Sequence, residues 1–180
     1  MGVIEVLVAA ALLFAVPGST AQQQGGTKTM TEDKRDWGEP MGGCRVSIVW
    51  LPSSETEFRS YILDIVFRND GTSAVQFPRS SMWFDYDFSV RTDDGVEVPL
   101  TEFGEQQREN LGAAAAAVME VQPGEEYRST VELSLLYELD RPGTYSVQAS
   151  KTFRDPKTHQ FVTAVSNRLP LKITTSPGRP

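Results

Sequence analysis

The sequence contains only one cysteine, Cys44, and one histidine, His159. A chain with a single cysteine cannot form an intramolecular disulfide, so its folded part must depend on its hydrophobic core. A zinc site that needs two or three histidines is also excluded within one chain. We interpret Cys44 as a small buried residue that opens the first strand; a thiol paired between chains and a lipid-attachment site remain alternatives.

The residue patterns of common catalytic sites are also lacking. His159 closes Asp155–His159, a predicted hairpin tip, and an exposed tip is a poor place for the oriented base of a Ser-His-Asp triad. The glycines do not form a phosphate-binding loop between a strand and a helix. We therefore predict that the chain is not an enzyme and uses no cofactor. The alternative is a hydrolase that acts through carboxylates or a Ser–Lys pair.

Clustered positive charge is scarce as well. The chain has 17 Lys and Arg against 24 Asp and Glu, which gives a formal net charge of −7. The densest basic pair, Lys34-Arg35, is flanked by the acidic residues Glu32, Asp33 and Asp36. Nucleic-acid binding needs clustered Lys and Arg against the phosphate backbone, so we predict no nucleic-acid partner.

The apolar run Val6–Val16 is too short for a transmembrane helix, which needs roughly 20 apolar residues. Its length is typical of a signal peptide, and Ser19 and Ala21 are small enough for the cleavage positions. The preceding residues carry Glu5 and no Lys or Arg, which departs from the usual pattern. We predict a signal peptide at 1–21, an exported protein (periplasmic, cell-surface or extracellular), and no membrane attachment after cleavage. A buried N-terminal helix is the alternative.

The composition changes after the predicted cleavage site. Residues 22–43 are rich in Gly, Gln, Thr and charged residues and show no hydrophobic periodicity. We predict a flexible spacer there, in which Trp37 is either loose or docked on the folded body. The folded domain is predicted at 44–175, with a disordered tail at 176–180.

Two segments, Tyr127–Leu133 and Thr144–Phe153, alternate between the two faces of a strand. Period-two alternation indicates antiparallel strands with one face buried and one exposed to water. Glu102–Leu111 is polar and is predicted as a loop. Alternation and turn residues predict further strands at Arg45–Leu51, Ser60–Arg68, Ala74–Phe77, Phe84–Arg91, Val96–Leu100, Gln160–Val165 and Arg168–Thr174. Ala113–Val121 is interpreted as a strand, with a helix as the alternative because its five successive alanines favour one. The prediction is an all-β, immunoglobulin-like antiparallel β-sandwich of seven to nine strands.

A resemblance to known domains rests on three segments, Leu63–Gly71, Leu133–Leu139 and Pro142–Val147. Their pattern resembles the non-catalytic N-terminal β-sandwich domain of deuterolysin-like zinc endopeptidases, and related immunoglobulin-like domains of bacterial exported proteins. The likeness is close over 121–149 and loose over 45–175. The His-Glu-x-x-His motif of the protease domain is missing from this chain, so the resemblance implies a fold and no catalytic residues.

Clustered carboxylates and exposed aromatic residues are the remaining candidates for a site. Clustered acids can bind Ca²⁺, but we favour turn chemistry and a solvated strand face as the explanation of these acids; they are Asp85, Asp87, Asp93 and Asp94. The candidates for a surface patch that contacts a protein or a sugar are Trp83, Met82 and Phe77, although we favour a Trp83 that packs under a loop or seals the sandwich edge. Tyr137 is predicted as a structural tyrosine that plugs its connector and bonds the backbone.

These observations predict an exported, non-catalytic binding or structural module. It would engage an extracytoplasmic protein partner through a loop end or a sheet edge. The alternatives are the hydrolase above and a calcium- or carbohydrate-binding domain. The sequence leaves the oligomeric state open.

Overall fold

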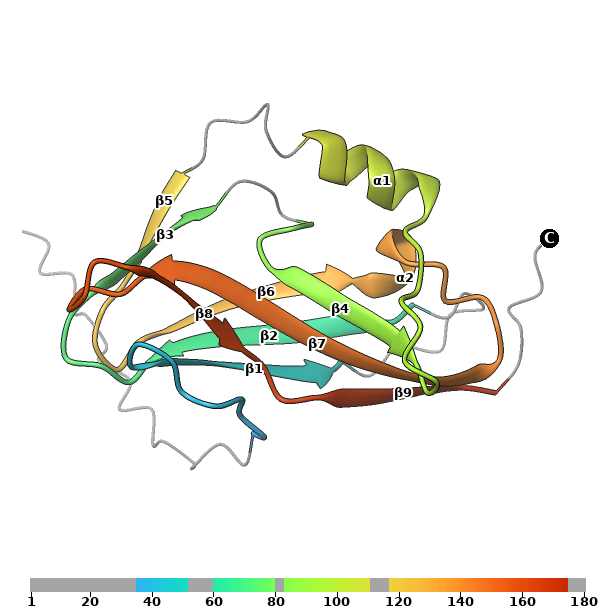
Figure 1. The fold of residues 1–180 in the computed structure, drawn as a ribbon, viewed down its shortest axis with the longest axis horizontal. Coiled ribbons are helices and arrows are strands. Elements are labelled where there is room, and N and C mark those ends of the chain that lie inside the picture. Colours follow the sequence, from blue (N-terminus) through green and yellow to red (C-terminus); the bar gives the residue numbers. More distant parts are fainter. Residues whose placement is uncertain (1–34, 52–59, 80–82, 111–116, 175–180) are drawn as a thin grey trace, which may run out of the picture. The chain divides into compact units, whose positions relative to one another are not determined.

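The computed structural model describes residues 35–51, 60–79, 83–110 and 117–174 (Figure 1). In this part of the chain nine strands form two antiparallel sheets, which confirms the predicted all-β sandwich. The finer immunoglobulin-like class stays a prediction. The predicted signal peptide and the C-terminal tail lie outside the described residues.

The first sheet has three strands in the order β1-β2-β6. They are β1 (Cys44–Trp50), β2 (Ile62–Asn69) and β6 (Glu126–Glu132). Val46 pairs with Phe67, and Phe67 pairs with Tyr127, so one register carries apolar side chains across all three strands. The alternation predicted for Tyr127–Leu133 is therefore that of a real strand, and Leu133 begins the short helix that follows it.

The second sheet is organised around β7 (Gly143–Arg154), which runs along its whole length (Figure 1). One edge of β7 pairs with β4 and β3, and the other pairs with β9 and β8. β5 continues the sheet beyond β3. The bounds of these strands are β3 (Val75–Arg79), β4 (Asp87–Thr92), β5 (Ala117–Val121), β8 (Phe161–Val165) and β9 (Leu169–Ile173).

The core lies between the facing sides of the two sheets. Phe67 of β2 is fully buried and makes edge-to-face contacts with Phe77 and Phe153, with ring centroids 5.2 and 5.4 Å apart. Such aromatic pairs are stabilising beyond the apolar area that they bury. Cys44 is also fully buried as a free thiol at the start of β1, as predicted. Burial raises the pKa of its thiol to about 12, which makes it a poor nucleophile at neutral pH.

The predicted loop at Glu102–Leu111 is wrong, because Glu102–Glu109 forms helix α1. Thr101 caps this helix: its hydroxyl accepts a hydrogen bond from the amide of Gly104 at 3.0 Å. Glu102 and Glu105 in the first turn suit the positive end of the helix dipole. The low hydrophobicity of this segment therefore led to the loop prediction, although the sequence contains the helix N-cap residue Thr101.

Three other predicted elements differ in extent. The strand expected at Phe84–Arg91 begins only at Asp87, and residues 83–86 form bends. Val96–Leu100 does not form a continuous strand; it contacts its neighbours through isolated bridges at Glu97 and Leu100. The strand expected at Ala113–Val121 is confirmed over Ala117–Val121, and 113–116 lie outside the described residues.

Residues 35–43, which the sequence analysis placed in a flexible spacer, pack along β1. The amide of Gly38 donates to the carbonyl of Val46 at 2.9 Å, and the hydroxyl of Ser47 donates to the carbonyl of Asp36 at 2.6 Å. A Cβ atom at Gly38 would lie 1.8 Å from the carbonyl oxygen of Val165, so only glycine allows this approach. Trp37 is docked, with the guanidinium of Arg45 over its ring. The segment thus protects the free edge of β1.

Asn69 joins the two sheets through its buried side chain. Its amide donates to the carbonyls of Ser73 and Val121, each at 2.9 Å, and its side-chain oxygen accepts from the amide of Gly71. We expect Asn69→Ala to lower the free energy of unfolding by about 1–3 kcal/mol, because buried backbone groups lose their partners. Urea unfolding would measure this. Asn110→Ala, at an exposed position, is the control; equal losses in both variants would contradict the prediction.

Candidate functional site

The three residues predicted to form a contact patch do not share a surface. Phe77 is 1% exposed and packs against Phe67 and Tyr127 in the core, so it cannot contact a partner. Met82 lies outside the described residues. Trp83 is half-buried and meets the ring of Phe103 edge-to-face, with centroids 5.3 Å apart. Phe103, on α1, was hidden from sequence reasoning because its segment was taken for a polar loop.

Helix α1 is fixed to the sandwich through α2 (Leu133–Leu136), beside which it lies (Figure 1). The amide of Thr101 donates to the carbonyl of Leu136 at 2.9 Å. Gly104 lies so close to α2 that a Cβ atom would be 2.3 Å from that same carbonyl oxygen. This close approach leaves Phe103 and Leu135 exposed, at 37% and 41%. We call Trp83, Phe103 and Leu135, with the charged side chains of α1, the α1 surface.

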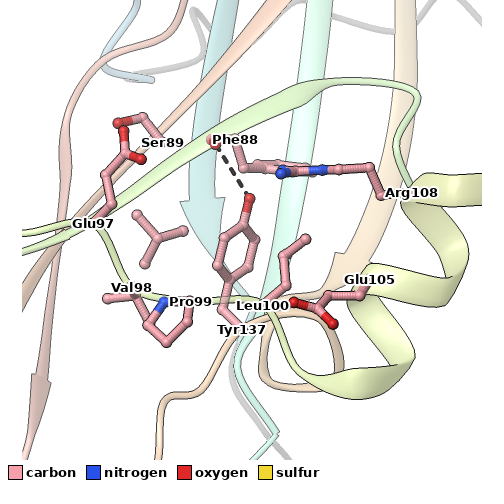
Figure 2. A pocket seen from close by; sticks show the side chains of 10 residues that line it. Phe88, Ser89, Glu97, Val98, Pro99, Leu100, Glu105, Arg108 and Tyr137 are labelled. Carbon is pink, nitrogen blue, oxygen red and sulfur yellow. Dashed lines mark hydrogen bonds between the residues drawn. The ribbon is translucent and has the colours of Figure 1, made fainter.

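A pocket of about 420 Å³ lies beside this surface, between α1, β4 and residues 97–100 (Figure 2). Arg108 extends from α1 toward the hydroxyl of Tyr137, and Glu97 stands on the opposite side. Glu97 is paired with Arg91 at 2.8 Å. The full lining is Phe88, Ser89, Val90, Glu97, Val98, Pro99, Leu100, Glu105, Arg108 and Tyr137. The lining thus combines apolar side chains with the charged Glu97, Glu105 and Arg108.

Tyr137 has the structural role predicted for it. Its side chain is buried, and its hydroxyl donates to the backbone carbonyl of Phe88 at 3.2 Å. The bond reaches β4 rather than the connector of Tyr137 itself, so this tyrosine ties the segment that follows α2 to β4. Burial raises the pKa of Tyr137 to about 12, an effect that Arg108 opposes. The phenol therefore stays protonated at neutral pH and acts as a hydrogen-bond donor.

A second cluster lies inside the sandwich, around Asp85 and Lys151. Asp85 was predicted on a solvated strand face, but it is only 5% exposed. Its Oδ1 lies 2.8 Å from Nζ of Lys151, and the side chains of the pair are 2% and 5% exposed. Residues 83–86 bend before β4 begins, so strand alternation does not extend to Asp85. The prediction failed because it assumed a longer strand.

Aromatic groups surround this ion pair. Nζ of Lys151 lies 4.3 Å from the ring centre of Phe77 and 5.2 Å from that of Tyr86. The hydroxyl of Tyr127 donates to Oδ2 of Asp85 at 3.1 Å. Burial lowers the pKa of Lys151, and the hydrogen bond to Asp85 opposes this shift. Burial also raises the pKa of Tyr127 to about 12, so its phenol is a donor at neutral pH.

The sequence did contain a signal for this cluster. Lys151 stands in the inward register of β7, between Ala149 and Phe153, which are both fully buried. A lysine in such a register needs an acidic partner, since an unpaired buried charge is strongly destabilising. The sequence does not identify which acidic residue is the partner of Lys151.

Comparison with known proteins identifies the family of this chain. Residues 49–174 match the family described as "Flagellar collar protein C, N-terminal domain". The chain belongs to this family. No curated protein matches it. The resemblance to the domain of deuterolysin-like endopeptidases is untested by these comparisons and stays a prediction.

The match covers nearly the whole sandwich of this flagellar collar domain. It runs from the end of β1 through β9 and includes α1, the pocket and the pair Asp85–Lys151. The segment 35–43 along β1 precedes the matched residues. Among the described residues of this family member, no helix is long and apolar enough to cross a membrane.

The four aspartates considered for calcium do not converge in this flagellar collar domain. Asp85 is committed to Lys151, and Asp87 is exposed at the start of β4. Asp93 and Asp94 lie in the turn after β4, where the hydroxyl of Thr92 donates to Asp94. Among the described residues, no group of three His, Cys, Asp or Glu side chains is placed to hold a metal ion. Ca²⁺ takes six to eight oxygen ligands, so the predicted set does not make a site.

His159 lies in the exposed turn where the sequence placed it. Its φ is 58°, and its amide donates to the carbonyl of Asp155 at 2.8 Å. The carboxylate of Asp155 accepts from the amide of Lys157 and from the hydroxyl of Thr158. These bonds to its carboxylate lower the pKa of Asp155. Asp155 therefore stabilises the turn, and His159 closes it.

Proposed function

We propose that this chain is a non-catalytic structural module of a flagellar collar, exported to the cell envelope, which binds another protein through the α1 surface. The observation that carries the proposal is the family match over 49–174. A signal peptide at 1–21, predicted from the sequence, suits a periplasmic location.

The interior chemistry supports a scaffold. Three buried or half-buried ionisable groups are engaged with one another: Lys151 with Asp85, and Asp85 with Tyr127. The thiol of Cys44 is sealed at the start of β1. Groups held in this way stabilise and position the sheets, and they do not face the pocket beside α1.

The α1 surface supports the choice of contact region. Phe103 and Leu135 expose apolar area, and the ring of Phe103 meets that of the half-buried Trp83. Protein interfaces commonly have such an apolar centre within a polar rim. Helix α1 carries Glu102, Glu105 and Glu109 against one base, Arg108, and is therefore acidic. We infer a protein partner whose contact surface is apolar with a basic rim.

The test is co-purification of the tagged full chain with flagellar motors isolated from the cell envelope. We expect the unmodified chain to sediment with the motors and Phe103→Ala to weaken binding roughly tenfold or more, as loss of a central aromatic contact does. Phe161→Ala is the matched control, because Phe161 is 75% exposed on β8, away from α1. An unmodified chain that never sediments with motors would refute the proposed function. Equal binding by both variants would refute the α1 surface as the contact.

A further inference from the structure

The buried pair Asp85–Lys151 is placed for a covalent reaction. We propose that Nζ of Lys151 condenses with Cγ of Asp85 to form an intramolecular amide cross-link, an isopeptide bond, and releases one water molecule. This proposal does not depend on the proposed function. It rests on the contact of the two side chains, on their seclusion from solvent and on the groups that surround them.

The geometry holds the amine against the carboxyl group. Nζ lies 2.8 Å from Oδ1 of Asp85 and 2.5 Å from the backbone carbonyl oxygen of the same residue, with the carbonyl of Pro78 at 3.4 Å. Lys151 is held by β7, which has strand neighbours on both edges. A reactive pair fixed in this way gains the large rate advantage of an intramolecular reaction, because the entropy of bringing the groups together is lost on folding.

Burial lowers the pKa of Lys151 and so favours the neutral amine that must react, against the hydrogen bond to Asp85. The rings of Phe77 and Tyr86 lie within about 5 Å of the amine, and the side chains of the pair are 5% and 2% exposed. Burial in apolar surroundings penalises two separate charges relative to a neutral amine and a neutral acid. Transfer of one proton from the ammonium of Lys151 to Oδ1 of Asp85 produces that neutral pair without any other reactant.

The condensation is then balanced within the cluster. The neutral amine forms a bond to Cγ, and the electron pair of the C=O bond moves onto Oδ2, where the hydroxyl of Tyr127 donates a hydrogen bond. The C–Oδ1 bond then breaks, and Oδ1 leaves as water with the proton that it first received and one further proton from the nitrogen. An ammonium and a carboxylate thus become one amide and one water, with no net change in charge and no redox step.

Such a cross-link would join two parts of the fold that are distant in sequence. Asp85 precedes β4 and Lys151 lies near the end of β7, 66 positions later. The cross-link would close a loop of this size in the unfolded chain and lower the conformational entropy of that state, as a disulfide does, which stabilises the fold. A chain with one cysteine cannot obtain this effect from an intramolecular disulfide.

Mass spectrometry of the full chain tests the proposal directly. Because trypsin does not cleave after a modified lysine or before Pro142, the cross-link predicts a branched peptide that joins 80–91 to 129–154. A Lys151→Arg variant processed in the same way gives, after correction for the substitution, the mass of the chain without a cross-link. The intact mass of the unmodified chain should be lower than this value by one water. Separate peptides 80–91 and 129–151, with no mass deficit in the unmodified chain, would overturn the proposal.

A second variant tests the role of Tyr127 in the reaction. Tyr127→Phe removes the donor to Oδ2 and should slow cross-linking by roughly 100-fold, the usual cost of losing one oxyanion donor. Tyr145→Phe is the matched control, since its hydroxyl donates to the carbonyl of Arg141, away from the pair. The measurement is the cross-linked fraction at successive times after a short pulse of synthesis. Equal rates in the two variants would overturn the assignment of Tyr127.

Discussion

Lys151→Ala is expected to lower the free energy of unfolding by about 3–5 kcal/mol or more, because it leaves Asp85 buried without its charged partner and also prevents the proposed amide cross-link. The variant leaves the carboxylate of Asp85 in the interior beside Phe77 and Tyr86. The hydrogen bond from Tyr127 remains, but it cannot replace the lost positive charge. Urea unfolding of the variant and the unmodified chain measures the difference.

The double variant Asp85→Ala/Lys151→Met separates the buried charge from other effects of the substitution. We expect it to recover much of the stability lost in Lys151→Ala, because apolar replacement of both partners of a buried pair is often neutral. Both variants lack the amide, so the difference between them reports the unpaired carboxylate together with the larger side chain at position 151. Lys172→Ala, at an exposed position of β9, should change stability by less than about 0.5 kcal/mol. A double variant no more stable than Lys151→Ala would contradict this account.

Phe67→Ala is expected to cost about 3–5 kcal/mol, as removal of a large core side chain usually does. Phe67 is fully buried at the contact between the two sheets, and its ring meets those of Phe77 and Phe153. The strands on either side cannot close the resulting cavity without giving up ladder hydrogen bonds. Thermal unfolding should show a loss in Tm on the order of 10–20 °C.

Phe161→Ala is the matched control for this second prediction. It makes the same chemical change at a side chain that is 75% exposed on β8. We expect a change within about 0.5 kcal/mol, since little apolar area leaves water at this position on folding. Comparable losses of Tm in the two variants would show that the core is not located between these sheets.

Local pattern predicted the strands well where the strand is long and has one buried face. β7 follows the predicted alternation from Tyr145 to Phe153, and β6 does so over Tyr127 to Val131. The pattern failed at α1, whose composition is polar because Gly104 is the one buried residue of this helix. It also failed at residues 35–43, which pack through backbone hydrogen bonds rather than through a periodic apolar face.

The candidate site was predicted only in part. Trp83 was named as a candidate contact residue; it is half-buried, and its neighbour is Phe103 of α1 rather than Phe77. Phe77 and Trp83 are close in sequence, yet one side chain enters the core and the other meets a helix that comes later in the chain. Nearness along the sequence is a weak guide to a shared surface when bends separate the residues.

The sequence by itself determined the class of this protein. Period-two alternation leads to an antiparallel β-sandwich, one cysteine means that this sandwich depends on its core, and one histidine excludes zinc sites that need two or three. These properties are local or compositional, so they can be recognised before folding is known. Only the tertiary structure decided that Asp85 meets Lys151, that Asn69 joins the sheets and that α1 lies against α2. Each of these contacts depends on strand register and on chain bends, which bring together residues whose spacing in the sequence carries no signal.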